Sequence, residues 1–303
     1  MEKLRLALDW TPTTNHTGFF VARQLGFYAA ENLEVDILTP DADDYSVTPA
    51  KKLEAGVVDF AVAPLESAIS LATKPNKVAA KAIATLLQTD LSAIVTLRQS
   101  GLRSPRHLDG KTYASYKARY EDDIVRRMIV NDGGQGTLRI TYPAKLGIWD
   151  TLLANQADAT WIFMNWEGFE AAGRQVELHY FKLADYAIPY SYSPVVLALT
   201  DTIHHRREVC RAFVRATKRG FLHARANPEQ SSEILAGSVP EKDRRVINIL
   251  ESQLYTAAHY GDETTWGKMA LPAVATFIDW LKTNCSETST LNAADICTNE
   301  LLT

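Results

Sequence analysis

Aromatic and polar residues follow several predicted strands, where together they could recognise a flat ligand. Aromatic faces stack on planar rings, and carboxylates and amides read ring amino groups and ring nitrogens through fixed donor and acceptor patterns. Such a lining suits a small heteroaromatic ligand held in a pocket. The candidate ligand-binding residues are Trp10, Asn15, His16, Glu66, Ser115, Tyr116, Glu121, Trp161, Tyr190 and Tyr192.

Several of these residues also have a purely structural interpretation, which the sequence leaves open. Trp10 could cover the core, and Trp161 alternates with core positions of a predicted strand. His16 could cap the helix that follows it. Glu66 and Glu121 each open a predicted helix, where the helix dipole stabilises a carboxylate.

Motifs for covalent or metal chemistry are missing from the sequence. It contains no G-x-S-x-G, no H-E-x-x-H and no Walker loop. It also has no C-x-x-C pair for a structural zinc site. Cys210, Cys285 and Cys297 are expected to pack as free thiols, although Cys285 and Cys297 are close enough in sequence for a local disulfide. We therefore expect no catalytic residue, no metal and no cofactor.

The elements that position these residues alternate between strand and helix. This order indicates βαβ units and mostly parallel sheets, whose ligands bind beyond the carboxyl ends of the strands. The expected strands are 4–8, 33–38, 57–63, 79–87, 93–97, 138–142, 159–163 and 195–199. The expected helices are 19–26, 50–55, 66–72, 121–130, 149–153, 206–225, 230–236, 241–258 and 270–282.

The alternation restarts near residue 94, which predicts an α/β fold with two lobes. Residues 94–194 form one expected lobe, and 1–93 together with 195–303 form the other. Two crossings of the chain would make a two-strand hinge, with the ligand cleft between the lobes. A length of 303 residues agrees with two domains.

Composition excludes several classes of protein. Hydrophobic residues make up 46% of the chain, and 32 basic residues against 36 acidic ones give a net charge of -4. These values exclude a disordered, collagen-like or coiled-coil chain and disfavour a nucleic-acid binder. The sequence has no secretory h-region and no apolar run of about 18 residues, so no membrane span is expected. We expect a monomer.

Four segments carry a resemblance to a known family. They are LDWTPTTNHTG at 8–18, GVVDFAVAPLES at 56–67, WIFMNWEGFEA at 161–171 and IPYSYSPV at 188–195. In these segments the chain resembles the formylaminopyrimidine-binding proteins, which serve ABC importers of a thiamine pyrimidine precursor. They share a superfamily with fungal hydroxymethylpyrimidine phosphate synthase. The resemblance implies a type II periplasmic-binding-protein fold that closes on an aminopyrimidine, and an ABC permease as partner.

The resemblance also implies roles for individual residues. Trp10 and Tyr192 would stack on the pyrimidine ring, and Glu66 and Glu121 would accept hydrogen bonds from its N–H groups. Residues that would contact or support the ligand are Asn15, His16, Ser115 and Trp161. The importer role implies a periplasmic protein or a lipoprotein whose signal was removed, and a cytoplasmic one if Met1 is the native start.

Two segments depart from the family pattern. At 190–192 the chain has Tyr-Ser-Tyr where the family often has Asp-Tyr-Tyr. At 114–120 it has ASYKARY where the family often has a glycine-rich loop. Tyr116 and Tyr120 could be a surface pair there. Lys117 and Arg119 could meet an anionic ligand or remain solvated.

The synthase relatives differ from this chain at their reactive positions. The chain has Ala63 and Ser67 where the synthase has lysine and histidine, and 189–193 stands where the synthase has a run of cysteines. Without an amine nucleophile no Schiff base forms there. We therefore expect a binding protein. The alternative is a cytoplasmic synthase-like enzyme or sensor for another heterocycle, such as a pyridoxal species or a flavin.

Overall fold

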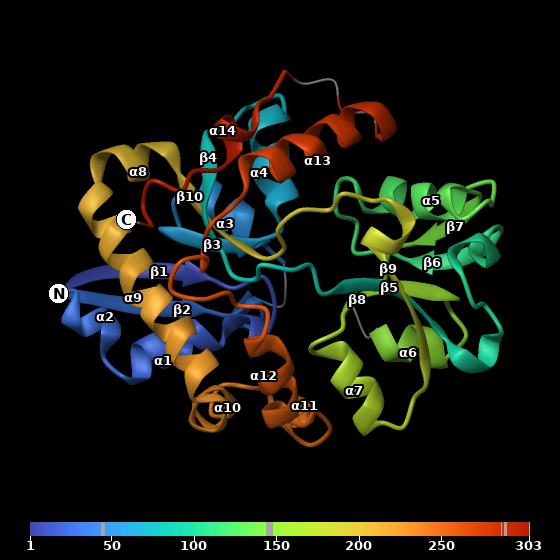
Figure 1. Ribbon diagram of the computed structural model, residues 1–303, viewed down its shortest axis with the longest axis horizontal. Helices are drawn as coiled ribbons and strands as arrows, with labels where there is room; N and C mark the ends of the chain where they lie inside the picture. Colours follow the sequence, from blue (N-terminus) through green and yellow to red (C-terminus); the bar gives the residue numbers. More distant parts are fainter. Residues whose placement is uncertain (44–45, 144–147, 286, 288–289, 303) are drawn as a thin grey trace. The chain divides into compact units, whose positions relative to one another are not determined.

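The computed structural model describes residues 1–43, 46–143, 148–285, 287 and 290–302, with only the backbone at 148–150. This part of the chain contains two five-stranded sheets. Each sheet belongs to one of two units (Figure 1). Unit 1 comprises Met1–Asp90, Ser191–Ala275 and Thr290–Thr303, and unit 2 comprises Leu91–Tyr190 and Thr276–Ser289. Among the described helices, none has both the length and the apolar character needed to cross a membrane.

The sheet of unit 1 has the strand order β2-β1-β3-β10-β4. Its strands are β1 (Glu2–Ala7), β2 (Leu33–Leu38), β3 (Phe60–Ala63), β4 (Ala80–Thr85) and β10 (Val195–Leu199). β1 pairs in parallel with β2 and β3, whereas β10 is antiparallel to β3 and β4. All four residues of β3 are buried, as is typical of a central strand covered on both faces.

Helices of unit 1 pack on this sheet and on one another. They are α1 (Thr17–Gln24), α2 (Phe27–Ala30), α3 (Pro49–Glu54), α4 (Leu65–Thr73), α8 (Thr200–His205), α9 (Arg207–Ala226), α10 (Pro228–Ala236), α11 (Glu241–Arg244), α12 (Ile249–Ala257) and α14 (Ala293–Ile296). Figure 1 shows α9 alongside α1. The two helices approach closely where Gly18 of α1 meets Gly220 of α9.

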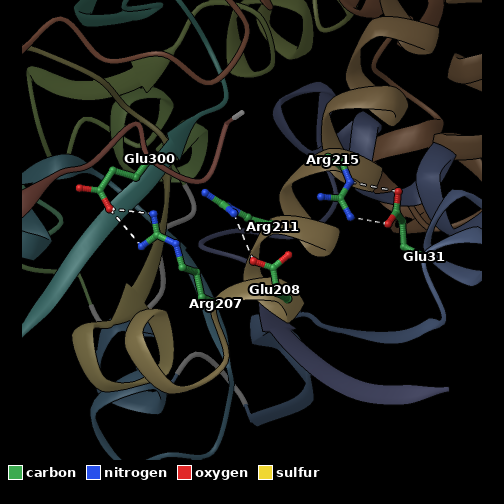
Figure 2. Close-up of polar contacts among 6 residues, drawn as sticks. All are labelled: Glu31, Arg207, Glu208, Arg211, Arg215 and Glu300. Atoms are coloured by element: carbon green, nitrogen blue, oxygen red, sulfur yellow. Dashed lines mark hydrogen bonds and ion pairs between the residues drawn. The ribbon is translucent and has the colours of Figure 1, made fainter.

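Ion pairs fasten α9 to other segments of unit 1 (Figure 2). Arg207, Arg211, Arg215 and Arg219 recur every four residues and so share one face of the helix. Arg207 pairs with Glu300 at 3.1 Å, and Arg215 pairs with Glu31 at 2.7 Å. Both glutamates lie outside α9. Each exposed pair contributes at most about 1 kcal/mol, so the hydrophobic face of α9 remains the main source of its stability.

The sheet of unit 2 has the strand order β7-β6-β8-β5-β9. Its strands are β5 (Ser92–Leu97), β6 (Lys111–Ala114), β7 (Leu138–Thr141), β8 (Ala159–Phe163) and β9 (Leu178–Lys182). Its helices are α5 (Glu121–Asn131), α6 (Ile148–Leu153) and α7 (Glu167–Gly173). β6 is parallel to β7 and β8, and β5 is antiparallel to β8 and β9.

One strand is reversed in each sheet, which corrects the expectation of mostly parallel pairing. β5 and β10 are the first strands after the chain passes from one unit to the other, at 90–91 and at 190–191. Each enters the middle of its new sheet and pairs with antiparallel strands on both sides. The sheets are therefore mixed.

Two local predictions also require correction. β9 was missed, because as an edge strand it leaves Tyr180 and Lys182 exposed and carries a weak hydrophobic pattern. The single helix expected at 241–258 is divided into α11 and α12. The second helix restarts because Asn248 caps it, with its Oδ1 accepting the Glu251 N–H at 3.2 Å.

The C-terminal segment divides between the units in a way that the sequence did not indicate. Helix α13 (Leu271–Asn284) begins in unit 1, but 276–289 belongs to unit 2. Within unit 2, Phe277 of this segment contacts Tyr190 edge to face, with ring centroids 5.4 Å apart. Two expectations stay predictions. They are the bounds of the lobes, 1–93 with 195–303 and 94–194, and the cleft between the lobes.

The three cysteines are buried free thiols. Cys285 belongs to unit 2, whereas Cys210 and Cys297 belong to unit 1. Burial raises the pKa of the Cys297 thiol to about 11, so it remains protonated at neutral pH. Cys285 and Cys297 are therefore free thiols in the structure and do not form the local disulfide that their sequence spacing allowed.

We predict that the contact between α1 and α9 fails when Gly220 gains a side chain. An alanine Cβ at Gly220 would lie 2.0 Å from the Gly18 carbonyl oxygen and 2.9 Å from Ala22 Cβ. Gly220→Ala should lower the free energy of unfolding by about 2 kcal/mol, since overpacking a tight contact costs more than the helix propensity of alanine returns. Urea unfolding measures this change.

Gly237→Ala is the matched control. Its Cβ would meet only the Ile234 carbonyl oxygen, at 3.5 Å, and its backbone is helical. This variant should be neutral or more stable by less than about 1 kcal/mol. Equal unfolding midpoints for Gly220→Ala and wild type would show that the two helices are free to separate.

Candidate functional site

Three neighbouring strands of unit 1 bring candidate residues to one edge of the sheet. β1 and β3 are parallel, so the loop carrying Trp10 and the helix carrying Glu66 leave from the same edge. β10 is antiparallel and therefore begins at that edge, at Val195, three positions after Tyr192. The Leu65 N–H donates to the Tyr192 carbonyl oxygen at 3.1 Å. We call Trp10, Asn15, His16, Glu66 and Tyr192 the unit 1 group.

The members of the unit 1 group differ in exposure. Trp10 and Tyr192 are half-buried, and Glu66 is 6% exposed in the first turn of α4. Tyr192 has a φ of 57°, a left-handed conformation that costs a bulky residue about 1–3 kcal/mol. Two hydrogen bonds hold it there, one from Leu65 and one from the Ala270 N–H to its phenol oxygen at 2.8 Å.

His16 is committed to its own loop. The Thr13 N–H donates to His16 Nδ1 at 3.1 Å, which leaves the ring proton on Nε2 to donate to Asp9 Oδ1 at 2.7 Å. His16 is fully buried, and Thr13 and His16 form a capping box. Asn15 is also buried, and its N–H donates to Thr13 Oγ1. His16 thus caps the short turn 14–16 to which it belongs, and its side chain makes no capping hydrogen bond to α1, the helix that follows it. His16 and Asn15 shape the loop that presents Trp10.

A buried network of hydroxyl and amide side chains joins this loop to helix α12. The sequence did not predict this network. Thr14 Oγ1 lies 3.0 Å from Ser252 Oγ and accepts the Thr256 hydroxyl at 2.8 Å. The Thr17 hydroxyl donates to Gln253 Oε1 at 2.7 Å. All five side chains are fully buried. The available signal was the polar stripe of α12, where hydroxyl and amide residues occupy positions that a core-facing helix would normally fill with apolar ones.

The second set of candidates follows β6 and β8 of unit 2. These strands are neighbours, with Ala114 opposite Thr160, and the Thr160 hydroxyl donates to the Ala114 carbonyl oxygen at 2.9 Å. Ser115 and Tyr116 continue directly from β6, and Trp161 follows Thr160 in β8. We call Ser115, Tyr116, Glu121, Trp161 and Tyr190 the unit 2 group.

Glu121 organises the loop between β6 and α5. Its Oε1 accepts the Tyr113 hydroxyl at 2.6 Å and the Tyr116 N–H at 3.0 Å, and its Oε2 accepts the Ala118 N–H at 3.2 Å. Burial raises the pKa of the Glu121 carboxyl, against the opposing effect of these hydrogen bonds. Because both oxygens already accept from the protein, Glu121 holds the loop in place.

Aromatic rings continue from β8 into the C-terminal segment. Trp161, 9% exposed, meets Tyr190 at a centroid distance of 5.3 Å and an interplanar angle of 64°. Tyr190 meets Phe277 at 5.4 Å and 75°. Such edge-to-face contacts fix ring orientation. Phe277 was not among the predicted site residues, since nothing in the local sequence connects α13 with β8.

The structure thus gathers the candidates into one group in each unit. Each group contains aromatic rings and a carboxylate, but the Glu121 carboxylate of the unit 2 group is taken up by its own loop. Aromatic faces and a carboxylate are the chemistry that binds a flat ring bearing N–H groups. Ala63 ends β3 as a buried methyl group beside Glu66, so this position offers no amine. Among the described residues no cluster of three histidines, cysteines or carboxylates could hold a metal ion.

Known proteins resemble this chain over most of its length. It is 27% identical over 242 residues to 4-amino-5-hydroxymethyl-2-methylpyrimidine phosphate synthase of Legionella pneumophila, covering 79% of this chain and 74% of that protein. It is 24% identical over 257 residues to the formylaminopyrimidine-binding protein of Halalkalibacterium halodurans, covering 84% of this chain and 76% of that protein.

A solved structure shows the fold. The periplasmic nitrate-binding protein NrtA from Synechocystis PCC 6803 superimposes with a TM-score of 0.74 at 12% identity, covering 99% of this chain and 87% of that one. The predicted periplasmic-binding-protein fold is confirmed. The model of the family described as NMT1/THI5 like matches residues 13–231, more than half of the chain. The predicted relationship is therefore confirmed as well, and the chain belongs to the NMT1/THI5-like family.

Proposed function

We propose that this protein binds a small aminopyrimidine, such as formylaminopyrimidine, and delivers it to an ABC importer. One observation carries the proposal: Trp10, Glu66 and Tyr192 come to the same sheet edge from β1, β3 and β10. The formylaminopyrimidine-binding relative supports it, because it matches 84% of this chain.

The chemistry of the unit 1 group suits this ligand class. The half-buried rings of Trp10 and Tyr192 offer stacking faces, and the Glu66 carboxylate accepts from an exocyclic amino group. The unit 2 group, taken by itself, offers aromatic rings from Trp161, Tyr190 and Tyr116 and a hydroxyl from Ser115. Glu121, His16 and Asn15 act by positioning the loops.

The proposed role carries further consequences for the protein's surroundings. An importer function makes a permease the macromolecular partner and places the protein outside the cytoplasmic membrane. We propose that it acts as a monomer. A genomic neighbourhood encoding a permease and an ATPase would support this assignment.

The synthase relative defines the competing function. It is 27% identical to this chain, so a cytoplasmic enzyme or sensor for a pyridoxal species or a flavin is the second candidate. The side chains at the edge of β3 favour binding without catalysis. The resemblance to the synthase implies lysine and histidine at the positions of Ala63 and Ser67, and neither of these two residues supplies an amine for a Schiff base.

Removing either stacking ring should weaken binding. We expect Trp10→Ala and Tyr192→Ala each to reduce the affinity for formylaminopyrimidine by about 1–3 kcal/mol, because each loses stacking and burial of an aromatic face. Isothermal titration measures this change, after a thermal-shift screen over aminopyrimidines, thiamine, pyridoxal forms and riboflavin. A bound ligand raises the melting temperature by mass action.

Two further variants separate stacking from general damage. Tyr192→Phe keeps the ring but removes the hydroxyl oxygen that accepts a hydrogen bond from the Ala270 N–H. This variant should retain most of the affinity. Tyr180→Ala removes a tyrosine that is 41% exposed on the edge strand β9 and should bind as wild type does. Wild-type affinity in Trp10→Ala would remove that ring from the site, and the absence of any thermal shift with formylaminopyrimidine would refute the ligand assignment.

A test with pyridoxal phosphate separates binder from enzyme. We expect no stable imine absorbance after incubation and dialysis, because the edge of β3 presents Ala63 and Ser67 rather than an amine. Dialysis removes the reversible adducts of surface lysines. A persistent imine, traced by borohydride reduction and peptide mapping to a lysine beside either group, would favour the synthase-like function.

A further inference from the structure

A buried carboxylate from the C-terminal segment binds the loop of the unit 2 group. Glu287 is 4% exposed, and its Oε2 accepts from Arg119 Nη2 at 2.9 Å. The Tyr120 hydroxyl donates to the same oxygen. The Arg119 guanidinium also lies over the Tyr120 ring, 4.9 Å from its centroid. Glu287 therefore holds both residues that close the loop before α5.

Carboxylates hold this loop at two points. Glu121 accepts the backbone N–H groups of Tyr116 and Ala118, and Glu287 binds the side chains of Arg119 and Tyr120. Charge-assisted hydrogen bonds are roughly twice as strong as neutral ones. The loop that carries Ser115 and Tyr116 is thus fixed before any ligand arrives.

The same segment supports the aromatic part of the unit 2 group. Phe277 contacts Tyr190, which in turn contacts Trp161. The Phe277 ring also stacks on Trp280 of α13, with centroids 6.4 Å apart. Glu287 therefore touches the loop after β6, and Phe277 touches the ring pair beside β8.

Glu287 also changes the charge that the loop presents. The two cations of the loop are Lys117 and Arg119, and Arg119 is neutralised by its pairing with Glu287. The other cation, Lys117, lies over the Tyr142 ring, 5.4 Å from its centroid. The pairing therefore removes one of the two positive charges that would attract an anionic ligand, and it leaves the binding of a neutral ligand unaffected.

We propose that Glu287 is a positioning residue of the unit 2 group that fixes the loop at 115–120 and cancels the charge of Arg119, so that the protein selects uncharged heteroaromatic ligands over their anionic esters. The proposal rests on the proposed function for its ligand class. It also explains the bulky, basic sequence of this loop: Arg119 and Tyr120 serve contacts with Glu287.

A matched pair of probes tests the selectivity. The neutral probe is 4-amino-5-hydroxymethyl-2-methylpyrimidine and the anionic probe is its phosphate ester. Glu287→Gln leaves Arg119 charged without its carboxylate, so the ratio of the two affinities should shift toward the phosphate ester by about fivefold. Adding Arg119→Gln removes the released charge, and the double variant should recover the wild-type ratio.

Two other variants serve as controls. Glu300→Gln breaks the exposed pair with Arg207 in unit 1 and should leave both affinities unchanged. Glu287→Asp keeps the charge and should keep the wild-type ratio. If Glu287→Gln fails to fold, Arg119→Gln alone gives the answer: it leaves the Glu287 carboxylate without its cation, so the ratio should shift toward the neutral probe. An unchanged ratio in Glu287→Gln, or in Arg119→Gln alone, would overturn the assigned role in selectivity.

The positioning role is tested without ligand. Hydrogen exchange at the Tyr116 and Ala118 amides should be faster in Glu287→Gln than in wild type, and unchanged in Glu300→Gln. Equal exchange in all three proteins would overturn that role. If wild type binds neither probe, the proposed function is wrong, while the exchange rates still decide whether Glu287 holds the loop.

Discussion

The antiparallel direction of β10 is the constraint on which the unit 1 group depends. Val195 lies opposite Ala63, so β10 begins at the edge where β3 ends. The residues immediately before β10 are thereby placed beside the start of α4, and the Leu65 N–H bonds to the Tyr192 carbonyl oxygen. A parallel strand in this position would begin at the opposite edge, so Tyr192 could not lie beside Glu66.

Buried polar networks then hold the loop after β1 and the loop after β6 in fixed positions. The hydroxyl network around Thr14 and the carboxylate of Glu121 lie where unpaired polar groups would be costly. Because their partners are all present, each network rigidifies its loop. Loops ordered in advance lose less conformational entropy on binding, which leaves more of the interaction energy for affinity.

The sequence predicted features that depend on neighbours along the chain and missed those that depend on distant ones. β2 and β8 have the predicted bounds, since each is a short apolar or alternating run between turns. His16 and Glu121 bind partners within eight residues, but neither side chain makes the capping hydrogen bond to α1 or α5 that the sequence left open. Thr14 and Ser252 are 238 positions apart, and Arg119 and Glu287 are 168 apart, so no local pattern connects them.

These long-range contacts also bear on how one fold serves both binding proteins and a synthase. The backbone edge that presents Glu66 is set by pairing of β1, β3 and β10, and this pairing does not depend on the side chain at Ala63 or Ser67. A lysine or histidine at these two positions would change the chemistry of the edge without changing the strand order. Function therefore resides in a few side chains on a common scaffold, and under the proposed function those of this chain recognise a ring.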